Sequence, residues 1–356
     1  MDIVCEAPIT EDIYFQMVRY YMPVLSRSIA PFHEIEVQAP LAPPIACITQ
    51  GVGAGISCGV DSFYTVMKMK EEPIEKFRLT FLLFANVNAL TIELDTSQRI
   101  FESKASRYSK VADKLGLDFV SVNTNYLVFH HELLEKGVTA ISSSCKTCSC
   151  VFAIQKMIDT YYYSSSDSLD KFLLSEHDPT RYDLFTLKEL ATDTIRFYSS
   201  GVEELTRMGK LKDIKKFDVV RENLCVCAGD NCGQCAKCLR TQAELYALGA
   251  LDEFRGVFDV QDFCDHLATR LGKLFSYPSE RKDGYVKEII SAAHANGVHI
   301  PLSSHILSAF FFRPAGAIHR TLKKHPWYRR LYYGKGIDEF ISGKSAAELN
   351  RPKDFR

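Results

Sequence analysis

A long apolar run that leads into a glycine-containing turn limits the folds open to this chain more than any other part of the sequence. Residues 46–58 are small or apolar, which predicts a buried strand. Helix-forming residues follow at 63–70, so the turn at 57–62 is expected between a strand and a helix. In an open α/β sheet, ligands bind at such strand-to-helix turns.

Two more apolar runs, at residues 77–85 and 117–122, predict strands that are buried on both faces. Residues 98–115 between them have the pattern of a helix. Strands that alternate with helices in this way predict an α/β fold with a doubly wound parallel sheet.

The turn reads Ser-Cys-Gly-Val-Asp-Ser over residues 57–62. The first N–H groups of a helix have no partner within the helix and favour an anion such as phosphate, which Gly59 would allow to come close. The hydroxyl groups of Ser57 and Ser62 add donors, whereas the Asp61 carboxylate suits a magnesium ion. No lysine follows, so this is not a Walker A loop. The alternative is an ordinary turn after a buried strand.

A group of cysteines predicts a metal site. Cys232, Cys235 and Cys238 form two consecutive C-x-x-C steps, a spacing that lets thiolates converge on one tetrahedral zinc ion. The fourth ligand is either Cys225 or Cys227. The alternative is a set of reduced, buried thiols without a metal.

The turn resembles the SGGxDS signature of the PP-loop family, the ATP pyrophosphatases that cleave ATP between its α- and β-phosphates and adenylate a substrate. The resemblance implies an adenine nucleotide α-hydrolase-like (HUP) fold, with ATP and Mg²⁺ as cofactors. It assigns catalysis to Asp61 and Ser62. It assigns nucleotide binding to the whole turn, which comprises Ser57, Cys58, Gly59, Val60, Asp61 and Ser62. Cys58 departs from the family pattern, which has a glycine there, and is expected to strain the backbone or crowd the phosphate.

The turn and the cysteine group together are similar to the 7-cyano-7-deazaguanine synthase group of that family, over about residues 50–245. The resemblance implies a structural zinc ion with Cys227 as the fourth ligand. It also implies that Arg207 and Lys210 contact phosphate or substrate, although both could be solvated charges on a helix.

The function implied by this resemblance is that of an ATP-dependent ligase. It would adenylate the carboxylate of a small deazaguanine-like acid, release pyrophosphate and AMP, and form an amide or nitrile with ammonia. One alternative is an enzyme that modifies a macromolecule, by tRNA thiolation or by amidation of a nucleobase or protein. Another is an ATP-binding protein whose catalysis is weakened, for which Cys58 is the main support.

Composition fits a globular enzyme. The chain has 356 residues, 46% of them hydrophobic, and a net charge of −1. This charge gives no global attraction to nucleic acid or to acidic membranes, so such a partner would have to be engaged locally. Twelve cysteines without a signal peptide indicate a reducing, cytoplasmic location. No apolar stretch reaches the roughly 20 residues of a membrane span, and a homodimer remains open.

We expect four regions along the chain. Residues 1–45 form an N-terminal extension with a strand and a helix, and residues 46–222 form the ATP-binding α/β domain. Residues 223–245 form the zinc knuckle, and residues 246–356 form a helical C-terminal region that carries a basic and aromatic tail.

A second cysteine group, Cys145, Cys148 and Cys150, lies at the start of a predicted helix. It could bind an iron–sulfur cluster or provide a reactive thiol, but buried small residues are the favoured interpretation.

The tail gathers basic and aromatic residues between positions 313 and 335, where no acidic residue occurs. Arg329 and Arg330 lie beside Trp327 and Tyr328, a combination that can bind nucleic acid. A solvated helix face is favoured over this alternative.

Overall fold

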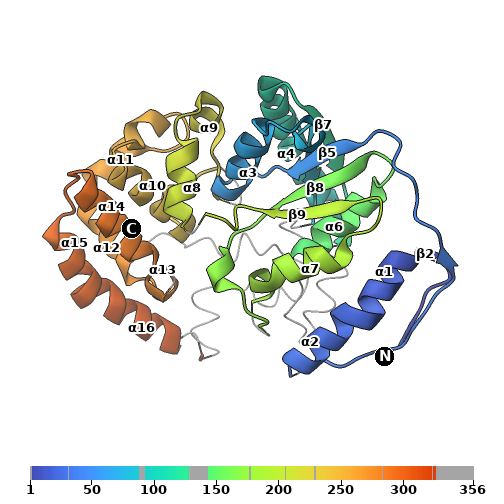
Figure 1. Ribbon diagram of the computed structural model, residues 1–356. Helices are drawn as coiled ribbons and strands as arrows, with labels where there is room; N and C mark the ends of the chain where they lie inside the picture. Colours follow the sequence, from blue (N-terminus) through green and yellow to red (C-terminus); the bar gives the residue numbers. More distant parts are fainter. Residues whose placement is uncertain are drawn as a thin grey trace. The chain divides into compact units, whose positions relative to one another are not determined.

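The computed structural model describes residues 2–30, 32–87, 93–126, 128, 143–175, 178–204, 206–227, 230–282, 284–322 and 324–325 (Figure 1). The chain divides into two compact units. The first comprises Met1–Ser57, Asp61–Ala89 and Ile100–Arg207, and the second comprises Cys58–Val60, Leu90–Arg99 and Met208–Arg356.

The first unit contains a parallel sheet of five strands, which confirms the α/β prediction. The strands are β5 (Gly51–Gly55), β6 (Phe81–Ala85), β7 (Asp118–Val122), β8 (Ile158–Ser164) and β9 (Arg196–Ser200). They lie in the order β7-β6-β5-β8-β9. Strands β6 and β7 therefore follow on one side of β5, and strands β8 and β9 follow on its other side. Such a reversal is the switch point at which doubly wound sheets bind ligands.

Alternating glycines give β5 its place at the centre of the sheet. A Cβ atom on Gly53 would lie 2.5 Å from the ring of Phe81, and one on Gly55 would lie 2.8 Å from the hydroxyl of Tyr161. The missing side chains therefore make room for the aromatic rings of the two neighbouring strands. On the opposite face of β5, Val52 and Ala54 are buried.

Helices cover both faces of the sheet. On the face of Phe81, buried side chains of α6 (Ser143–Ala153) and α7 (Asp183–Leu190) complete one hydrophobic cluster. On the other face, Phe84 contacts the rings of Phe101 and Tyr108 from α4 (Leu94–Leu115). Burial on both sides explains why β5 and β6 appear in the sequence as continuous apolar runs. The prediction that residues 117–122 are buried on both faces is wrong, because β7 is an edge strand whose residues are exposed or only partly buried.

The predicted strands were correct in position but too long. The run at 46–58 yields only β5, and the run at 77–85 begins with a 3₁₀ turn (Glu75–Phe77) before β6. The helix expected at 98–115 is α4, which begins four residues earlier at Leu94. Strands β8 and β9 were not predicted.

The N-terminal segment pairs with itself in two short parallel ladders. β1 (Ile3–Val4) pairs with β3 (Val37–Gln38), and β2 (Ile9–Thr10) pairs with β4 (Leu41–Ala42). In the sequence, α1 (Glu11–Gln16), a π-helical turn (Met17–Tyr21) and α2 (Met22–Ser28) lie between β2 and β3. Tyr21 stacks on Phe185 of α7, with ring centroids 5.6 Å apart, so this extension packs on the helical layer of the first unit.

The second unit is helical. Its helices are α8 (Arg207–Ile214, whose first residue belongs to the first unit), α9 (Asp218–Asn223), α10 (Ala236–Ala247), α11 (Val260–Asp265), α12 (Leu267–Ser276), α13 (Pro278–Lys282), α14 (Tyr285–Ala295), α15 (Leu302–Leu307) and α16 (Arg313–Leu322). Short 3₁₀ (Leu251–Phe254) and π-helical (Ser308–Phe312) segments connect some of them. Helix α10 is buried along most of its length and follows directly from the cysteine-rich loop.

Candidate functional site

The turn after β5 lies between a strand and a helix, as predicted, because α3 (Val60–Lys70) begins within it. The hydroxyl of Ser57 donates to the hydroxyl oxygen of Ser62 over 3.1 Å, and the backbone N–H of Ser57 also donates to that oxygen over 3.3 Å. The hydroxyl of Tyr108 donates to the Ser57 carbonyl over 3.4 Å. These bonds hold the two serines together at the beginning of α3.

Cys58 has a left-handed backbone conformation, with φ at +57°. A residue with a Cβ atom adopts this conformation at a cost of about 1–2 kcal/mol, whereas glycine does not pay it. The Cys58 side chain is fully buried, and its carbonyl accepts a hydrogen bond from the N–H of Cys225 over 2.8 Å. The strain that the sequence predicted at this departure from the family pattern is therefore present in the backbone.

A cavity of about 280 Å³ lies beside the turn, within the first unit. Its walls are the carboxyl ends of β5, β6 and β8, together with residues of α3, α4 and α6. The lining residues are Gly55, Ile56, Ser57, Ser62, Leu83, Phe84, Ala85, Asn86, Val87, Lys104, Tyr108, Thr147, Tyr161, Tyr163 and Ser164. Because β5 and β8 are neighbours on either side of the switch point, the cavity is where a doubly wound sheet binds its ligand.

The cavity favours an anion. Among the described residues that line it, Lys104 is the only one with an ionic side chain, and none of them carries a carboxylate. Burial raises the pKa of Tyr161 and of Tyr163, so both phenols stay neutral. The Ser164 Oγ is buried and has no hydrogen-bond partner among the described residues, which leaves it available to a ligand.

The structure brings two further predicted residues together. An Arg207 Nη lies 3.9 Å from an Asp61 carboxylate oxygen, and the arginine side chain is 11% exposed. The segment before Arg207 is held on α3 by Glu203, which accepts from Tyr64 over 3.3 Å and pairs with Lys68. Burial, the largest single cause, acts to raise the pKa of Glu203, but the hydrogen bond and charge of Lys68 together with backbone hydrogen bonds outweigh it, and the pKa is lowered.

The remaining predicted residues of the nucleotide site do not line the cavity. Val60 is buried at the start of α3, and Gly59 is half-buried. Lys210 lies on α8 in the second unit and is only 2% exposed. The prediction that Lys210 could be a solvated helix charge is therefore wrong.

Several lining residues were missed by the sequence analysis. Asn86 directly follows β6, so the end of a predicted strand could have pointed to it. Lys104 lies on a helix with many charged residues, and no local signal distinguishes it from them. Ser164 ends a strand that was not predicted.

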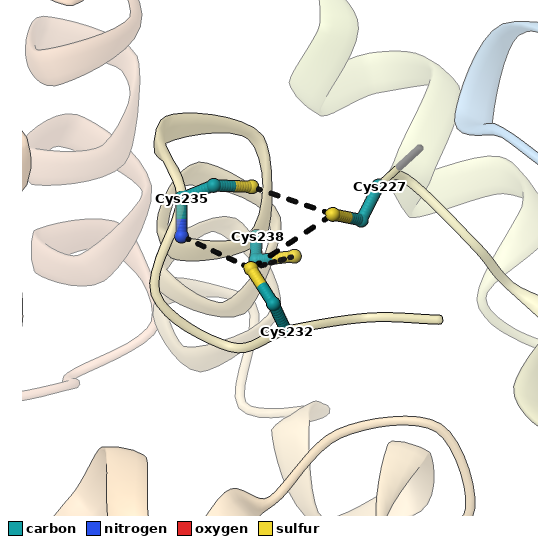
Figure 2. Close-up of side chains that lie close together, drawn as sticks. All are labelled: Cys227, Cys232, Cys235 and Cys238. Carbon is teal, nitrogen blue, oxygen red and sulfur yellow. Dashed lines mark hydrogen bonds between the residues drawn. The ribbon is translucent and has the colours of Figure 1, made fainter. Parts of the chain in front are cut away.

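The second candidate site is the cysteine group of the second unit. The sulfur atoms of Cys227, Cys232, Cys235 and Cys238 all lie within 4.8 Å of one another, and Figure 2 shows the four side chains directed toward a common centre. Three Sγ–Sγ distances are 3.8, 3.9 and 3.9 Å. Four ligands at the Zn–S distance of about 2.3 Å would lie about 3.8 Å apart in a tetrahedron. The group could therefore hold a zinc ion.

Side-chain amides fix the loops that carry these cysteines. Asn231 accepts from the N–H of Val226 over 2.9 Å and donates to the carbonyls of Leu224 and Val257 over 2.8 and 3.0 Å. Gln242 donates to the Gly233 carbonyl over 2.9 Å. Gly233 has φ at +71°, the left-handed conformation of a tight turn between two ligands.

The group is also prepared electrostatically for a cation. Hydrogen bonding from Cys238, followed by that from other groups of the cluster, lowers the pKa of Cys235 to about 5. The lowered pKa favours the thiolate of Cys235, which is the form that binds metals.

The structure resolves the choice between the two upstream cysteines. Cys227 is in the group, whereas Cys225 is a buried neighbour whose thiol donates to the Cys227 carbonyl over 3.7 Å.

The described residues give no support for a second metal site at the cysteines of α6. Among the described residues, the group of the second unit is the only cluster of His, Cys, Asp and Glu that could hold a metal ion. Cys148 and Cys150 are buried, and burial raises the pKa of both thiols, which makes them poor nucleophiles. This agrees with the favoured interpretation of buried small residues.

The proposed nucleic-acid contacts Arg329 and Arg330, with Trp327 and Tyr328, lie outside the described residues. Within the described part of the chain, no helix combines the length and the apolar character needed to cross a membrane.

No protein-family model, curated protein or solved structure matches the chain, so its function has to be inferred from the chemistry of these two sites.

Proposed function

We propose that this chain is an ATP-dependent ligase of the PP-loop type, with the HUP fold, that cleaves ATP between the α- and β-phosphates. One observation carries the proposal: the cavity at the switch point of the sheet combines a helix start, the hydroxyls of Ser57 and Ser62, and Lys104 as the one ionic side chain among its described lining residues. These groups suit a polyphosphate. The resemblance of residues 57–62 to the PP-loop signature supports the same ligand.

In this proposal Ser57, Ser62 and the first N–H groups of α3 bind the pyrophosphate part of ATP. Lys104 approaches from α4 and neutralises phosphate charge. The apolar wall at Leu83 and Phe84 suits the flat base of the nucleotide, since small-molecule sites are mostly apolar with a few polar groups that fix orientation. Ser164 offers one more hydroxyl to the ligand.

Asp61 would hold the magnesium ion that accompanies ATP, because carboxylate oxygens are the ligands that Mg²⁺ prefers. Bound there, the ion would supply charge neutralisation for the departing pyrophosphate. The guanidinium of Arg207 orients the Asp61 carboxylate and adds positive charge beside the phosphates.

In the proposed reaction a carboxylate oxygen of the acid substrate attacks the α-phosphorus. An acyl-adenylate forms and pyrophosphate leaves. Ammonia then attacks the acyl carbon, AMP leaves with the bonding electrons, and the ammonium nitrogen loses a proton to give an amide. The amide oxygen would then attack the α-phosphorus of a second ATP, with release of pyrophosphate and of one amide proton. The resulting imidate would lose AMP and the remaining N–H proton to give the nitrile. The resemblance favours a deazaguanine carboxylic acid as the substrate. Zinc at the cysteine group would be structural.

The test is mass-spectrometric detection of AMP and of new products after incubation with ATP, Mg²⁺, ammonia and 7-carboxy-7-deazaguanine. We expect AMP together with the amide or nitrile. Asp61→Asn should lower AMP release by on the order of 10²-fold or more, because it removes a charged ligand from the transition state. Lys104→Gln should raise the KM for ATP by about tenfold or more.

Matched controls are available on the same framework. Asp118→Asn alters an exposed carboxylate at the amino end of β7, and Lys110→Gln alters an exposed lysine of α4. Both variants should behave as the unmodified protein does. Activity that is insensitive to Asp61→Asn and Lys104→Gln would refute the assignment of the site.

Cys58 favours a second candidate, an ATP-binding protein whose turnover is weakened. Its strained backbone and buried side chain stand where the PP-loop signature has glycine. Calorimetric ATP binding without release of AMP would select this candidate. Restoration of AMP release by Cys58→Gly would identify the cysteine as its cause.

A further inference from the structure

The continuous helical segment 302–322 is formed by α15, the π-helical segment Ser308–Phe312 and α16. It exposes large apolar side chains and buries small polar ones. Ser304 is 0% exposed and Ser308 is 1% exposed. Leu302 and Phe310 are each 72% exposed, and Phe311 is 63% exposed. Ile306 and Ile318 extend the same kind of surface, with 48% and 60% exposure. This pattern is the reverse of that in an ordinary surface helix, which buries its apolar stripe.

Packing within the second unit explains which face is buried. Gly272 of α12 lies against the segment so closely that a Cβ atom there would meet Leu307 Cβ and the Ser304 carbonyl oxygen, each at 3.0 Å. The ring of Phe275 also contacts His305, with centroids 5.3 Å apart. The Ser308 Oγ is buried without a hydrogen-bond partner among the described residues. The small serines therefore allow close approach to α12, and the large apolar residues are left on the outside.

The charged side chains along this segment have one sign. No Asp or Glu occurs between Glu288 and Asp338 in the sequence. Within the described residues, Arg313 and Arg320 of α16 are exposed on the same segment as the apolar residues. An exposed face that combines phenylalanine and aliphatic side chains with arginine, and lacks acids, fits an anionic partner that also accepts apolar groups.

We propose that segment 302–322 docks this protein on the surface of an anionic lipid bilayer. Phe310, Phe311 and the neighbouring aliphatic side chains enter the boundary between headgroups and acyl chains, and Arg313 and Arg320 contact lipid phosphates. Nucleic acid would attract the arginines but offers no environment for Leu302 and Ile306. A second copy of this chain, docked through the same face, would bring two basic surfaces together, and like charges repel. The proposal goes beyond the ligase function and does not depend on it.

The test uses the full chain in co-sedimentation with vesicles of phosphatidylcholine, either alone or mixed with phosphatidylserine. Binding to the mixed vesicles, weakened by added sodium chloride, is expected. Replacement of Phe310 and Phe311 by serine should reduce binding by more than about tenfold. Arg313→Glu combined with Arg320→Glu should reduce it by about as much. Neither pair lies in a buried site, and thermal melts will check that each variant is folded.

Phe15→Ser is the matched control, since Phe15 is a 54% exposed phenylalanine on α1 of the first unit. It should leave vesicle binding unchanged. The proposal is overturned if no vesicles bind, if neutral and anionic vesicles bind equally, or if Phe15→Ser has the same effect as the double serine variant. It is also overturned if the segment instead holds a homodimer that light scattering shows to dissociate in the Phe310 and Phe311 variant.

Discussion

Four side chains from two short pieces of chain, at 227 and at 232–238, make up the cysteine group. The cavity beside the turn at 57–62 takes its lining from three strands and three helices spread over more than a hundred residues. The cysteine group has its ligand atoms already at the spacing of a zinc tetrahedron. The cavity forms only when the strands of the sheet have paired.

This difference predicts how each site responds to mutation. A bound metal concentrates its free energy in a few bonds, so the loss of one ligand has a large effect. The cavity depends on many contacts of modest strength, so single changes around it should each have a small effect on stability. The following predictions test that contrast.

The largest expected effect is the loss of a cysteine ligand. Protein prepared without chelators should contain about one zinc ion per chain. Cys227→Ser should abolish zinc binding and lower the Tm by roughly 10 °C or more, because the metal contributes folding free energy to the second unit. Metal analysis and calorimetry check both values.

Cys225→Ser is the control for that variant, since Cys225 is a neighbour of the group and not a member of it. It should retain the zinc ion. Equal loss of zinc from the two variants would contradict the ligand set.

The cysteine group was also the site that the sequence predicted most completely. Two C-x-x-C steps place three thiols near one point whatever the rest of the fold, so spacing alone was informative. The turn at 57–62 was correctly placed between a strand and a helix, because the local pattern specifies both elements. Lys104 and Ser164 could not be found in this way, since only the pairing of β5 with β6 and β8 brings them to the turn.

The second largest effect on stability is expected in β5, the strand that precedes the turn at 57–62. Gly53→Ala would place a Cβ atom 2.5 Å from the buried ring of Phe81 and should lower the free energy of unfolding by about 1–3 kcal/mol. Chemical denaturation measures the change. Gly256→Ala is the control, because a Cβ atom there meets no atom within 4 Å. If both substitutions had the same effect, crowding by Phe81 would not explain the glycine.

A smaller effect on stability is expected at Cys58. Its left-handed backbone destabilises the fold, whereas burial of its side chain stabilises it. Comparison of Cys58→Gly with Cys58→Ala isolates the backbone, because both remove the sulfur atom. The glycine variant should be more stable by about 1 kcal/mol, the reverse of the usual order, since glycine alone adopts φ at +57° without strain. An alanine variant of equal or greater stability would show that the turn relaxes.

The smallest effect should come from Glu203, which holds the segment before Arg207 on α3. Its pKa is lowered in the folded protein, so its contribution to stability is present above the unfolded-state pKa and is lost as the pH falls through the folded-state pKa. Glu203→Gln should cost at most about 0.5 kcal/mol at neutral pH, because the pair is partly exposed. The cost should disappear in acid. The control is Glu71→Gln, which alters an exposed carboxylate and should leave stability at neutral pH unchanged.

The identity of the bond that is cut in ATP tests the central proposal most directly. Incubation of the unmodified protein with ATP and Mg²⁺, an acid substrate and ammonia, followed by chromatography of the nucleotides, separates the two outcomes. We predict AMP and pyrophosphate, because the cavity and the turn suit binding of the pyrophosphate part as the leaving group. ADP and inorganic phosphate as the products would contradict PP-loop chemistry in this protein.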